Sequence, residues 1–117
     1  MLSLTRRAPP LYPQVHSVAA YYPEAPSPEE QAAARGLAAT LALLYPCLHC
    51  RAAFAAAAEE DPVDVSSRAA FSAWACRHHN RVNEALGKPL FPCDGGALQQ
   101  RWRTGCRGSA PSLNDAQ

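Results

Sequence analysis

The sequence predicts an all-α protein folded as a single helical bundle. No segment alternates apolar and polar residues over the length of a β-strand, whereas several segments repeat apolar residues at helical spacing. Proline, serine and glycine stand at the ends of these segments, where helices begin and stop. The chain has 117 residues, of which 48% are hydrophobic, so one small core can form. Many of these residues are alanine, which buries little area, so we expect a thin core that a disulfide or a bound cofactor would stabilise.

The chain begins with a proline-rich segment. Three prolines within residues 1–13 argue against a continuous helix there, and we expect this segment to be irregular. A first helix is expected from about Gln14 to Tyr22, where Pro23 ends it.

The second helix has the clearest start signal in the sequence. Ser27 can cap it, Pro28 fits its first turn, and Glu30 completes a Ser-x-x-Glu capping box. Leucines then recur at helical spacing as far as Tyr45. They are Leu37, Leu41 and Leu44.

Two further long helices and one short helix complete the expected bundle. Pro46 breaks the second helix and can start a third, which carries Cys47 and Cys50 in its first turn and runs to about Glu60. A fourth helix starts near Ser66 or Ser67 and is expected to end at Gly87, Lys88 and Pro89. A short helix is expected around residues 97–103. The composition beyond Cys106 predicts a disordered tail over residues 107–117, so the folded domain spans residues 14–106.

The net charge argues against nucleic-acid binding, and the lengths of the apolar runs argue against a membrane-spanning segment. Eleven basic and 10 acidic side chains give a net charge of +1, too little for binding nucleic acid by neutralising phosphates. No run of apolar residues is long enough to span a membrane. Arg6 and Arg7, with no acidic residue before Glu24, form only a weak targeting signal.

The cysteines offer two readings. Cys47 and Cys50 form a Cys-x-x-Cys pair at a helix start, where unpaired backbone N–H groups stabilise a thiolate and favour thiol–disulfide exchange. Together with Cys76 and His79, the same pair also gives an acceptable Cys3His zinc pattern. That pattern would leave Cys93 without a role. The spacing alone leaves both readings open.

The expected fourth helix carries a polar stripe beside its apolar face. Its core side is expected to consist of Phe71, Trp74, Ala75, Val82 and Leu86. About a quarter turn away lie Cys76, His79 and Asn83, with Asn80 beside them. Such a stripe indicates either a cofactor site inside a bundle or a solvated face that includes one core histidine.

Four segments in this order resemble the Erv/ALR family of FAD-linked sulfhydryl oxidases. The first is His-Ser-Val-Ala-Ala-Tyr-Tyr-Pro at residues 16–23, and the second is Tyr-Pro-Cys-Leu-His-Cys at residues 45–50. The third is Trp-Ala-Cys-Arg-His-His-Asn-Arg-Val-Asn at residues 74–83, continuing to Leu86-Gly87-Lys88-Pro89. The fourth is Phe91-x-Cys93 followed by Arg101-Trp102. The resemblance covers roughly residues 12–103 and favours redox chemistry over zinc.

The resemblance implies a four-helix bundle with a short fifth helix, which holds FAD in its mouth and usually forms a homodimer. Cys50 would be the thiol next to the flavin, and Cys47 the outer thiol that exchanges with protein dithiol substrates. Electrons would pass to O2, giving H2O2, or to another acceptor such as a cytochrome. Cys76 and Cys93 would form a structural disulfide. The residues at flavin-lining positions would be Tyr12, His16, Tyr21, Cys76, His79, Asn80, Val82, Asn83, Lys88, Arg101 and Trp102.

The chain departs from the family pattern at its N-terminal end. The family opens with Gly-Arg-x-x-Trp, whereas Tyr12 stands here at the position of the tryptophan and prolines replace the Gly-Arg portion. A chain that has lost FAD and serves as a scaffold therefore stays an alternative. No second Cys-x-x-Cys is present, so Cys106 is the remaining candidate for passing electrons or bridging subunits.

The expected chemistry also limits the cellular compartments in which the protein could work. An oxidase of this kind works where disulfides persist, so we expect the mitochondrial intermembrane space, with the secretory lumen as an alternative. The resemblance adds a third setting, the host cytoplasm, for a viral member of the family.

Overall fold

The computed structural model describes residues 11–104, all of whose regular elements are helices. The predicted tail at residues 107–117, Cys106 and residues 1–10 lie outside this range. Four long helices and a short fifth helix follow in order, as predicted. They are α2 (Leu11–Tyr21), α3 (Pro28–Leu44), α4 (Leu48–Glu60), α5 (Arg68–Ala85) and α6 (Gly95–Gln99), which continues as the π-helical turn η1 (Gln100–Thr104). None of the described helices is both long and apolar enough to cross a membrane.

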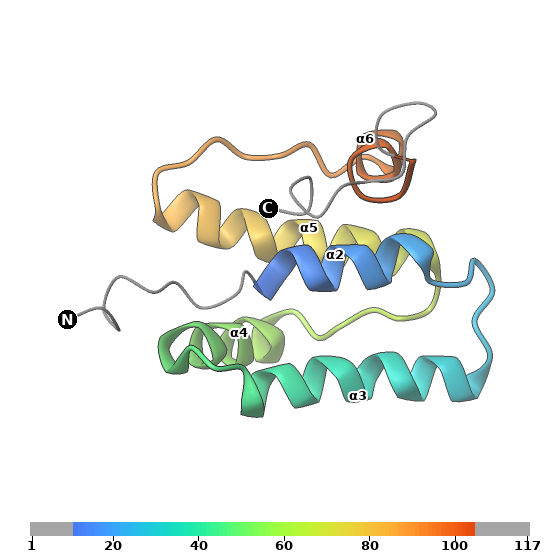
Figure 1. The fold of residues 1–117 in the computed structure, drawn as a ribbon, viewed down its shortest axis with the longest axis horizontal. Helices are drawn as coiled ribbons and strands as arrows, with labels where there is room; N and C mark the ends of the chain where they lie inside the picture. The colour runs from blue at the N-terminus through green and yellow to red at the C-terminus, as the bar shows by residue number, and fades with distance from the viewer. Residues whose placement is uncertain (1–10, 105–117) are drawn as a thin grey trace.

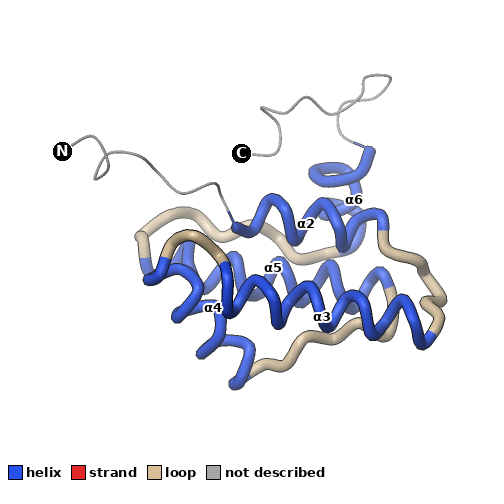
Figure 2. The backbone as a smooth tube through the Cα atoms, turned by 60° about the horizontal axis from the view of Figure 1, so that its bottom comes forward, coloured by secondary structure: helices blue, strands red, loops and turns tan. Residues whose placement is uncertain are grey.

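The helices form two layers (Figure 1). α2 packs along α5, and α3 packs along α4 below them. The short α6–η1 segment lies across the top, against α5 and α2. Figure 2 shows the same arrangement from another direction, with the long loop between α5 and α6 running back along the bundle.

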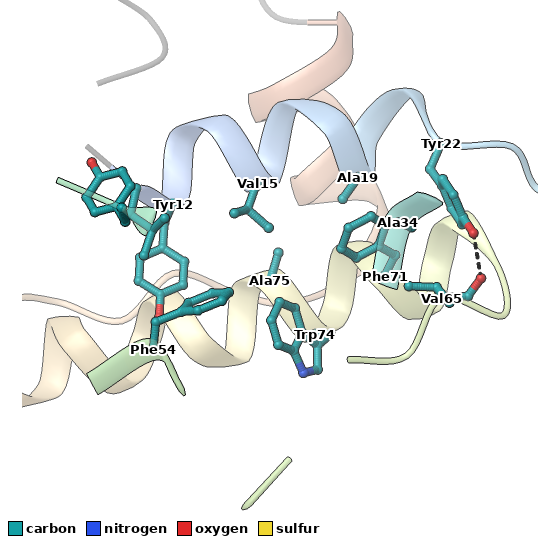
Figure 3. Packing of buried hydrophobic residues seen from close by; sticks show 12 residues of the cluster. Tyr12, Val15, Ala19, Tyr22, Ala34, Phe54, Val65, Phe71, Trp74 and Ala75 are labelled. Carbon is teal, nitrogen blue, oxygen red and sulfur yellow. Dashed lines mark hydrogen bonds between the residues drawn. The ribbon is translucent and has the colours of Figure 1, made fainter. Parts of the chain in front are cut away.

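Aromatic side chains fill most of the space between the layers (Figure 3). Phe54, Phe71 and Trp74 are at most 1% exposed, and Trp74 meets Phe54 edge to face. Small residues on α2, such as Ala19, let that helix approach α5 closely. Three large rings therefore supply much of the buried area in a core otherwise rich in alanine.

The start of α2 differs from the prediction. The helix begins at Leu11 rather than Gln14, so residues 11–13 are helical and the irregular segment cannot extend to residue 13. Pro13 is tolerated because it lies in the first turn, where a backbone N–H has no partner inside the helix. The earlier start places Tyr12 on the helix and in the core, where it is 8% exposed.

The other helix ends follow local signals. Ser27 and Glu30 form the predicted capping box, with the Glu30 N–H donating to the Ser27 hydroxyl at 3.0 Å. Cys47 is the residue that caps α4 rather than a member of its first turn. Gly87 follows α5 with φ 69°, a left-handed conformation that glycine adopts without strain. Leu86, predicted as core, is 63% exposed because it caps α5 where the helix passes beyond the core.

The C-terminal end of α4 is anchored to α5 through Asp61. The Trp74 indole N–H donates to the Asp61 backbone carbonyl at 2.7 Å, and Nε2 of the fully buried His78 lies 3.2 Å from its carboxylate. Arg77 pairs with the same carboxylate at 3.1 Å. These contacts fix one end of the helix whose other end carries Cys47.

Candidate active site

The Cys-x-x-Cys pair forms a disulfide at the start of α4. The Cys50 backbone N–H donates to the Cys47 sulfur at 3.1 Å, so Cys47 occupies the capping position of the helix. Both cysteines are half-buried and pack against the core. The free N–H groups and dipole of a helix N-terminus stabilise a thiolate at this position. The Cys47 sulfur is therefore placed to leave and attack as a thiolate in disulfide exchange.

Tyr45, two residues before Cys47, is part of the hydrophobic core. It is 4% exposed, and its hydroxyl has no hydrogen-bond partner among the described residues. Burial raises the pKa of this hydroxyl, which keeps it neutral. Tyr45 belongs to the core cluster against which Cys47 and Cys50 pack.

A second disulfide joins Cys76 on α5 to Cys93 in the loop before α6. Cys76 is only 1% exposed. Asn80, one turn further along α5, donates to the Phe91 carbonyl at 2.8 Å and accepts from the Phe91 N–H at 2.9 Å. The disulfide and the asparagine together hold the loop from α5 to α6 against the helix.

The two disulfides contradict the zinc alternative. A Cys3His site needs three free thiolates, but Cys47, Cys50 and Cys76 are all bonded to another sulfur. Within residues 11–104 no three His, Cys, Asp or Glu side chains gather as metal ligands.

The loop that Asn80 holds closes one side of a cavity of about 240 Å³. The cavity lies between α5, the start of the bundle at α2, and the α6–η1 segment. Its lining residues are His16, Cys76, His79, Asn80, Asn83, Pro89, Leu90, Phe91, Arg101 and Trp102. Seven of these ten are residues that the resemblance assigned to the flavin, so the polar stripe of α5 lines this open cavity.

Planar rings are stacked in and beside the cavity. The His16 ring is parallel to Trp102, with centroids 4.2 Å apart, and His79 is parallel to Tyr12 at 5.1 Å. His16 Nε2 and His79 Nδ1 lie 3.1 Å apart, within hydrogen-bonding distance. Four rings from three separate elements thus form a surface suited to a flat heterocycle.

The cavity keeps its histidines neutral and its edge positive. Burial, assisted by His79 and Arg101, lowers the pKa of His16 to about 3. Burial and the charges of Lys88 and Arg101 also lower the pKa of His79. The Arg101 guanidinium lies 4.2 Å from the centre of the Trp102 ring. Neutral imidazoles next to a fixed cation suit a ligand that combines an aromatic ring with phosphates.

Four of the residues assigned to the flavin lie outside the cavity wall. Tyr12 reaches it through its stack on His79, and Val82 packs against the core. Tyr21 is 59% exposed and donates its hydroxyl proton to the Arg103 carbonyl at 3.0 Å. Lys88 is exposed in the loop after α5 and acts on the cavity through its charge on His79.

Three lining residues were not assigned from the sequence. Pro89, Leu90 and Phe91 line the cavity because the disulfide and Asn80 draw their loop back onto α5. The sequence signal that could have identified them is their position between Lys88, which was assigned to the flavin, and Cys93, which was assigned to the disulfide. The fully buried His78 was also missed, because its role depends on α4 lying beside α5.

A larger hollow of about 680 Å³ lies between α5 and α6 on another side of the molecule. Its lining includes Glu24, Arg68 and Arg103 but no aromatic ring. Arg68 is already paired with Glu24 at 3.1 Å, so its charge is partly neutralised. The smaller cavity has the rings and polar groups that suit a flavin nucleotide, so it is the candidate site.

The residues around the smaller cavity fit FAD in kind. The rings suit its heterocycles, the carboxamides of Asn80 and Asn83 can donate and accept at ring or ribose edges, and Arg101 suits a phosphate. Its volume of about 240 Å³ lies below the roughly 300–1,000 Å³ usual for ligand sites. Part of a dinucleotide must therefore extend beyond the enclosed space, past the rim.

Comparisons with known proteins match most of the chain rather than the cavity alone. The model of the Erv1/Alr family matches residues 12–103. FAD-linked sulfhydryl oxidase ERV1 of Oryza sativa subsp. japonica is 41% identical over 88 residues, which make up 75% of this chain and 44% of the relative. Mitochondrial FAD-linked sulfhydryl oxidase ERV1 of Saccharomyces cerevisiae is 34% identical over 91 residues, 78% of this chain and 47% of the relative. The chain spans less than half the length of these relatives.

Solved structures agree with the sequence relatives. The FAD-binding domain of Erv1 from Saccharomyces cerevisiae superimposes with a TM-score of 0.76 at 33% identity, covering 80% of this chain and 88% of that one. The yeast Erv1 core gives a TM-score of 0.76 at 30% identity and covers 86% and 91% of the two chains. The described helices therefore correspond to nearly the whole of a flavin-binding core.

Proposed function

Because this chain belongs to the Erv1/Alr family, we propose that it is an FAD-dependent thiol oxidase that forms disulfides in protein dithiols. The observation that carries the proposal is the disulfide at the start of α4, in the same small bundle as a ring-lined cavity. Neither feature is needed for a helical bundle to fold. Together they supply an exchangeable disulfide and a place for an electron acceptor.

The exchange steps belong to the two cysteines of α4. A substrate thiolate attacks the Cys47 sulfur, a mixed disulfide forms, and Cys50 leaves as a thiolate. The second substrate thiolate then attacks the substrate sulfur of the mixed disulfide, and Cys47 leaves as a thiolate. The substrate is oxidised by two electrons, the Cys47–Cys50 pair is reduced by two, and the substrate's two thiol protons pass to solvent. The Cys50 N–H that points at the Cys47 sulfur stabilises the thiolate formed there.

The cavity residues would hold the cofactor. His16, His79 and Trp102 would contact its rings, Asn80 and Asn83 its polar edges, and Arg101 its phosphates. Tyr12, Tyr21, Cys76, Val82 and Lys88 complete the proposed set. FAD, when bound, would supply a two-electron acceptor for the reduced cysteine pair, and O2, giving H2O2, or another acceptor such as a cytochrome would be the final oxidant.

The setting of the enzyme is part of the proposal. We propose a homodimer whose domain spans residues up to Cys106, working in the mitochondrial intermembrane space. A relative in yeast is named as mitochondrial, which supports this compartment. The secretory lumen, and the host cytoplasm if the chain is viral, are the alternatives, because each must allow disulfides to persist.

Three measurements on the purified chain test the proposed function. The protein should be yellow, should release FAD on denaturation, and should consume O2 in the presence of a dithiol while producing H2O2. A colourless protein that binds stoichiometric zinc would contradict the proposal. A colourless protein with both disulfides intact and no turnover would favour the scaffold alternative instead.

A further inference from the structure

The strongest unexplained feature of the surface lies next to the Cys47–Cys50 disulfide. Leu43 and Leu44 are the last two residues of α3, and Leu48 is the first residue of α4. Their exposed fractions are 72%, 70% and 67%. We call these three residues the leucine collar. They make up three of the seven large hydrophobic side chains that are exposed in the described part of the chain.

The bundle does not need these side chains. Leu41, one turn before Leu44, packs against the core, as does Tyr45 immediately after it. The leucines of the collar instead lie on the outer side of α3 and α4. Single exposed leucines are common, but several beside a reactive group indicate an interaction surface.

The collar also lies in an uncharged stretch of sequence. No Asp, Glu, Lys or Arg occurs between Arg35 and Arg51, a stretch that includes the end of α3 and the whole disulfide turn. Residues 36–50 therefore contain no Asp, Glu, Lys or Arg that could form an ion pair with a charged thiol substrate, such as a small acidic peptide that carries a cysteine. What they offer is apolar area that a partner can bury.

We propose that the leucine collar is the docking surface for the substrate, and that the occupant is an unfolded, extended polypeptide segment with a large apolar residue beside its cysteine. This inference rests on the proposed function, because it names the substrate class of the same disulfide. The collar is continuous with the disulfide along the chain: Leu48 directly follows Cys47, and Leu44 precedes it by three residues.

The geometry of exchange leads to this occupant. A substrate sulfur must reach bonding distance of the Cys47 sulfur, which is half-buried between the ends of two helices. A cysteine inside a folded substrate cannot reach it without local unfolding, whereas a cysteine on an extended segment can. Because Leu44 and Leu48 are three residues and one residue from Cys47 in the chain, the residues next to that cysteine then come close to the collar. A small hydrophilic dithiol such as dithiothreitol reaches the same sulfur without using the collar.

The test compares three substrates of the holoenzyme. They are dithiothreitol, a reduced unstructured dithiol peptide with leucine beside each cysteine, and the same peptide with serine in place of each leucine. We expect kcat/KM for the leucine peptide to exceed that for the serine peptide by about tenfold, a ratio typical of partial apolar burial at an enzyme site. In the variant Leu44→Gln/Leu48→Gln this preference should disappear, while dithiothreitol turnover stays within about twofold of wild type.

Two control variants separate docking from stability. Leu86→Gln changes a leucine of similar exposure, 63%, on α5 and should leave the preference intact. Leu44→Met/Leu48→Met keeps the apolar area and should also retain it.

The possible results are distinct. Equal rates for the two peptides in the wild type, or a preference that survives Leu44→Gln/Leu48→Gln, would overturn the inference. So would a change in sedimenting mass in that variant without a change in peptide preference, because a second copy would then cover the collar. If dithiothreitol is not oxidised by the wild type, the proposed function itself fails.

Discussion

The two disulfides of the described chain differ in their surroundings more than in their spacing. In Cys76–Cys93 one partner, Cys76, is buried and the other is half-buried, and Asn80 hydrogen-bonds both the N–H and the carbonyl of Phe91 in the loop next to it. Cys47–Cys50 caps a helix at the edge of the bundle, next to three exposed leucines. The sequence contains both a Cys-x-x-Cys and a Cys-x-x-His, which look equally suited to chemistry. Because Cys47 caps a helix while Cys76 lies within one, we propose exchange for the first pair and support of the cavity for the second.

The largest expected effect comes from the Cys47–Cys50 pair. Cys47→Ser and Cys50→Ser should each reduce dithiol oxidation to the background rate, because disulfide exchange needs both sulfurs. Oxygen uptake with dithiothreitol measures this directly. The matched control is Cys76→Ala/Cys93→Ala, whose folded fraction should still turn over. Normal turnover in Cys47→Ser or Cys50→Ser would show that this pair does not carry out the disulfide exchange.

The Cys76–Cys93 disulfide should instead contribute to the free energy of unfolding. Cys76→Ala/Cys93→Ala removes a link between residues 17 apart and should lower the free energy of unfolding by about 3 kcal/mol. Denaturant titration gives this value. Reduction of Cys47–Cys50 alone should cost much less, since it closes a turn of separation 3. Similar losses for both would mean that the two disulfides share a structural role.

Asn80 should show how the Cys76–Cys93 disulfide shapes the cavity. Asn80→Ala leaves the Phe91 N–H and carbonyl without their partner, which should cost about 1–3 kcal/mol and weaken FAD binding. Asn80→Asp keeps an acceptor for the Phe91 N–H and should lie between alanine and wild type. Thermal unfolding with and without added FAD separates the two effects. An alanine variant as stable as wild type would show that the disulfide alone holds the loop.

Acid should destabilise the fold through its three buried or half-buried histidines. His16, His78 and His79 all have a pKa lowered chiefly by burial, so the unfolded chain takes up their protons first as the pH falls. Stability is full above the unfolded pKa of about 6.5 and decreases below it. For His16, whose folded pKa is about 3, the loss approaches 1.4 kcal/mol per pH unit between these values.

The histidine prediction has its own control. His78→Gln removes one of the three groups and should flatten the dependence of the melting temperature on pH between about 6.5 and 5. An unchanged slope in this variant would show that His78 does not contribute. A melting temperature that rises on acidification would contradict the lowered pKa of all three histidines.

The smallest effect is expected at an exposed ion pair near the far end of α4. Arg81 and Glu60 are paired at 2.6 Å, but their side chains are 48% and 67% exposed. Glu60→Gln should therefore change the free energy of unfolding by less than about 1 kcal/mol. Asp61→Asn, one residue further, should cost more, because its carboxylate faces the buried His78. Equal effects in denaturant titration would contradict this anchoring of α4.

The helices were predictable because their signals are local. The capping box of Ser27 and Glu30, and the glycine after α5, act within one turn and need no tertiary information. The polar stripe of α5 was also predictable, since Cys76, Asn80 and Asn83 follow from helical periodicity alone. Their identification with a flavin site needed the family resemblance.

The remaining features depend on packing between elements. The start of α2 at Leu11 depends on core contacts that outweigh the signal of Pro13. The exposure of Leu86 reflects where α5 leaves the bundle, and the stack of His16 on Trp102 joins residues far apart in sequence. The apolar periodicity of α3 gave no indication that Leu44 would be exposed, because only the position of α4 decides which of its leucines are covered.

We propose that Cys47 and Cys50 pass electrons to a flavin held in the ring-lined cavity. Anaerobic mixing of the purified protein with dithiothreitol, followed in the visible spectrum, tests it most directly. The yellow flavin band should bleach in the wild type and in Cys76→Ala/Cys93→Ala, and should persist in Cys50→Ser. A band that bleaches equally fast in Cys50→Ser, or a wild-type protein without a flavin band, would contradict the claim.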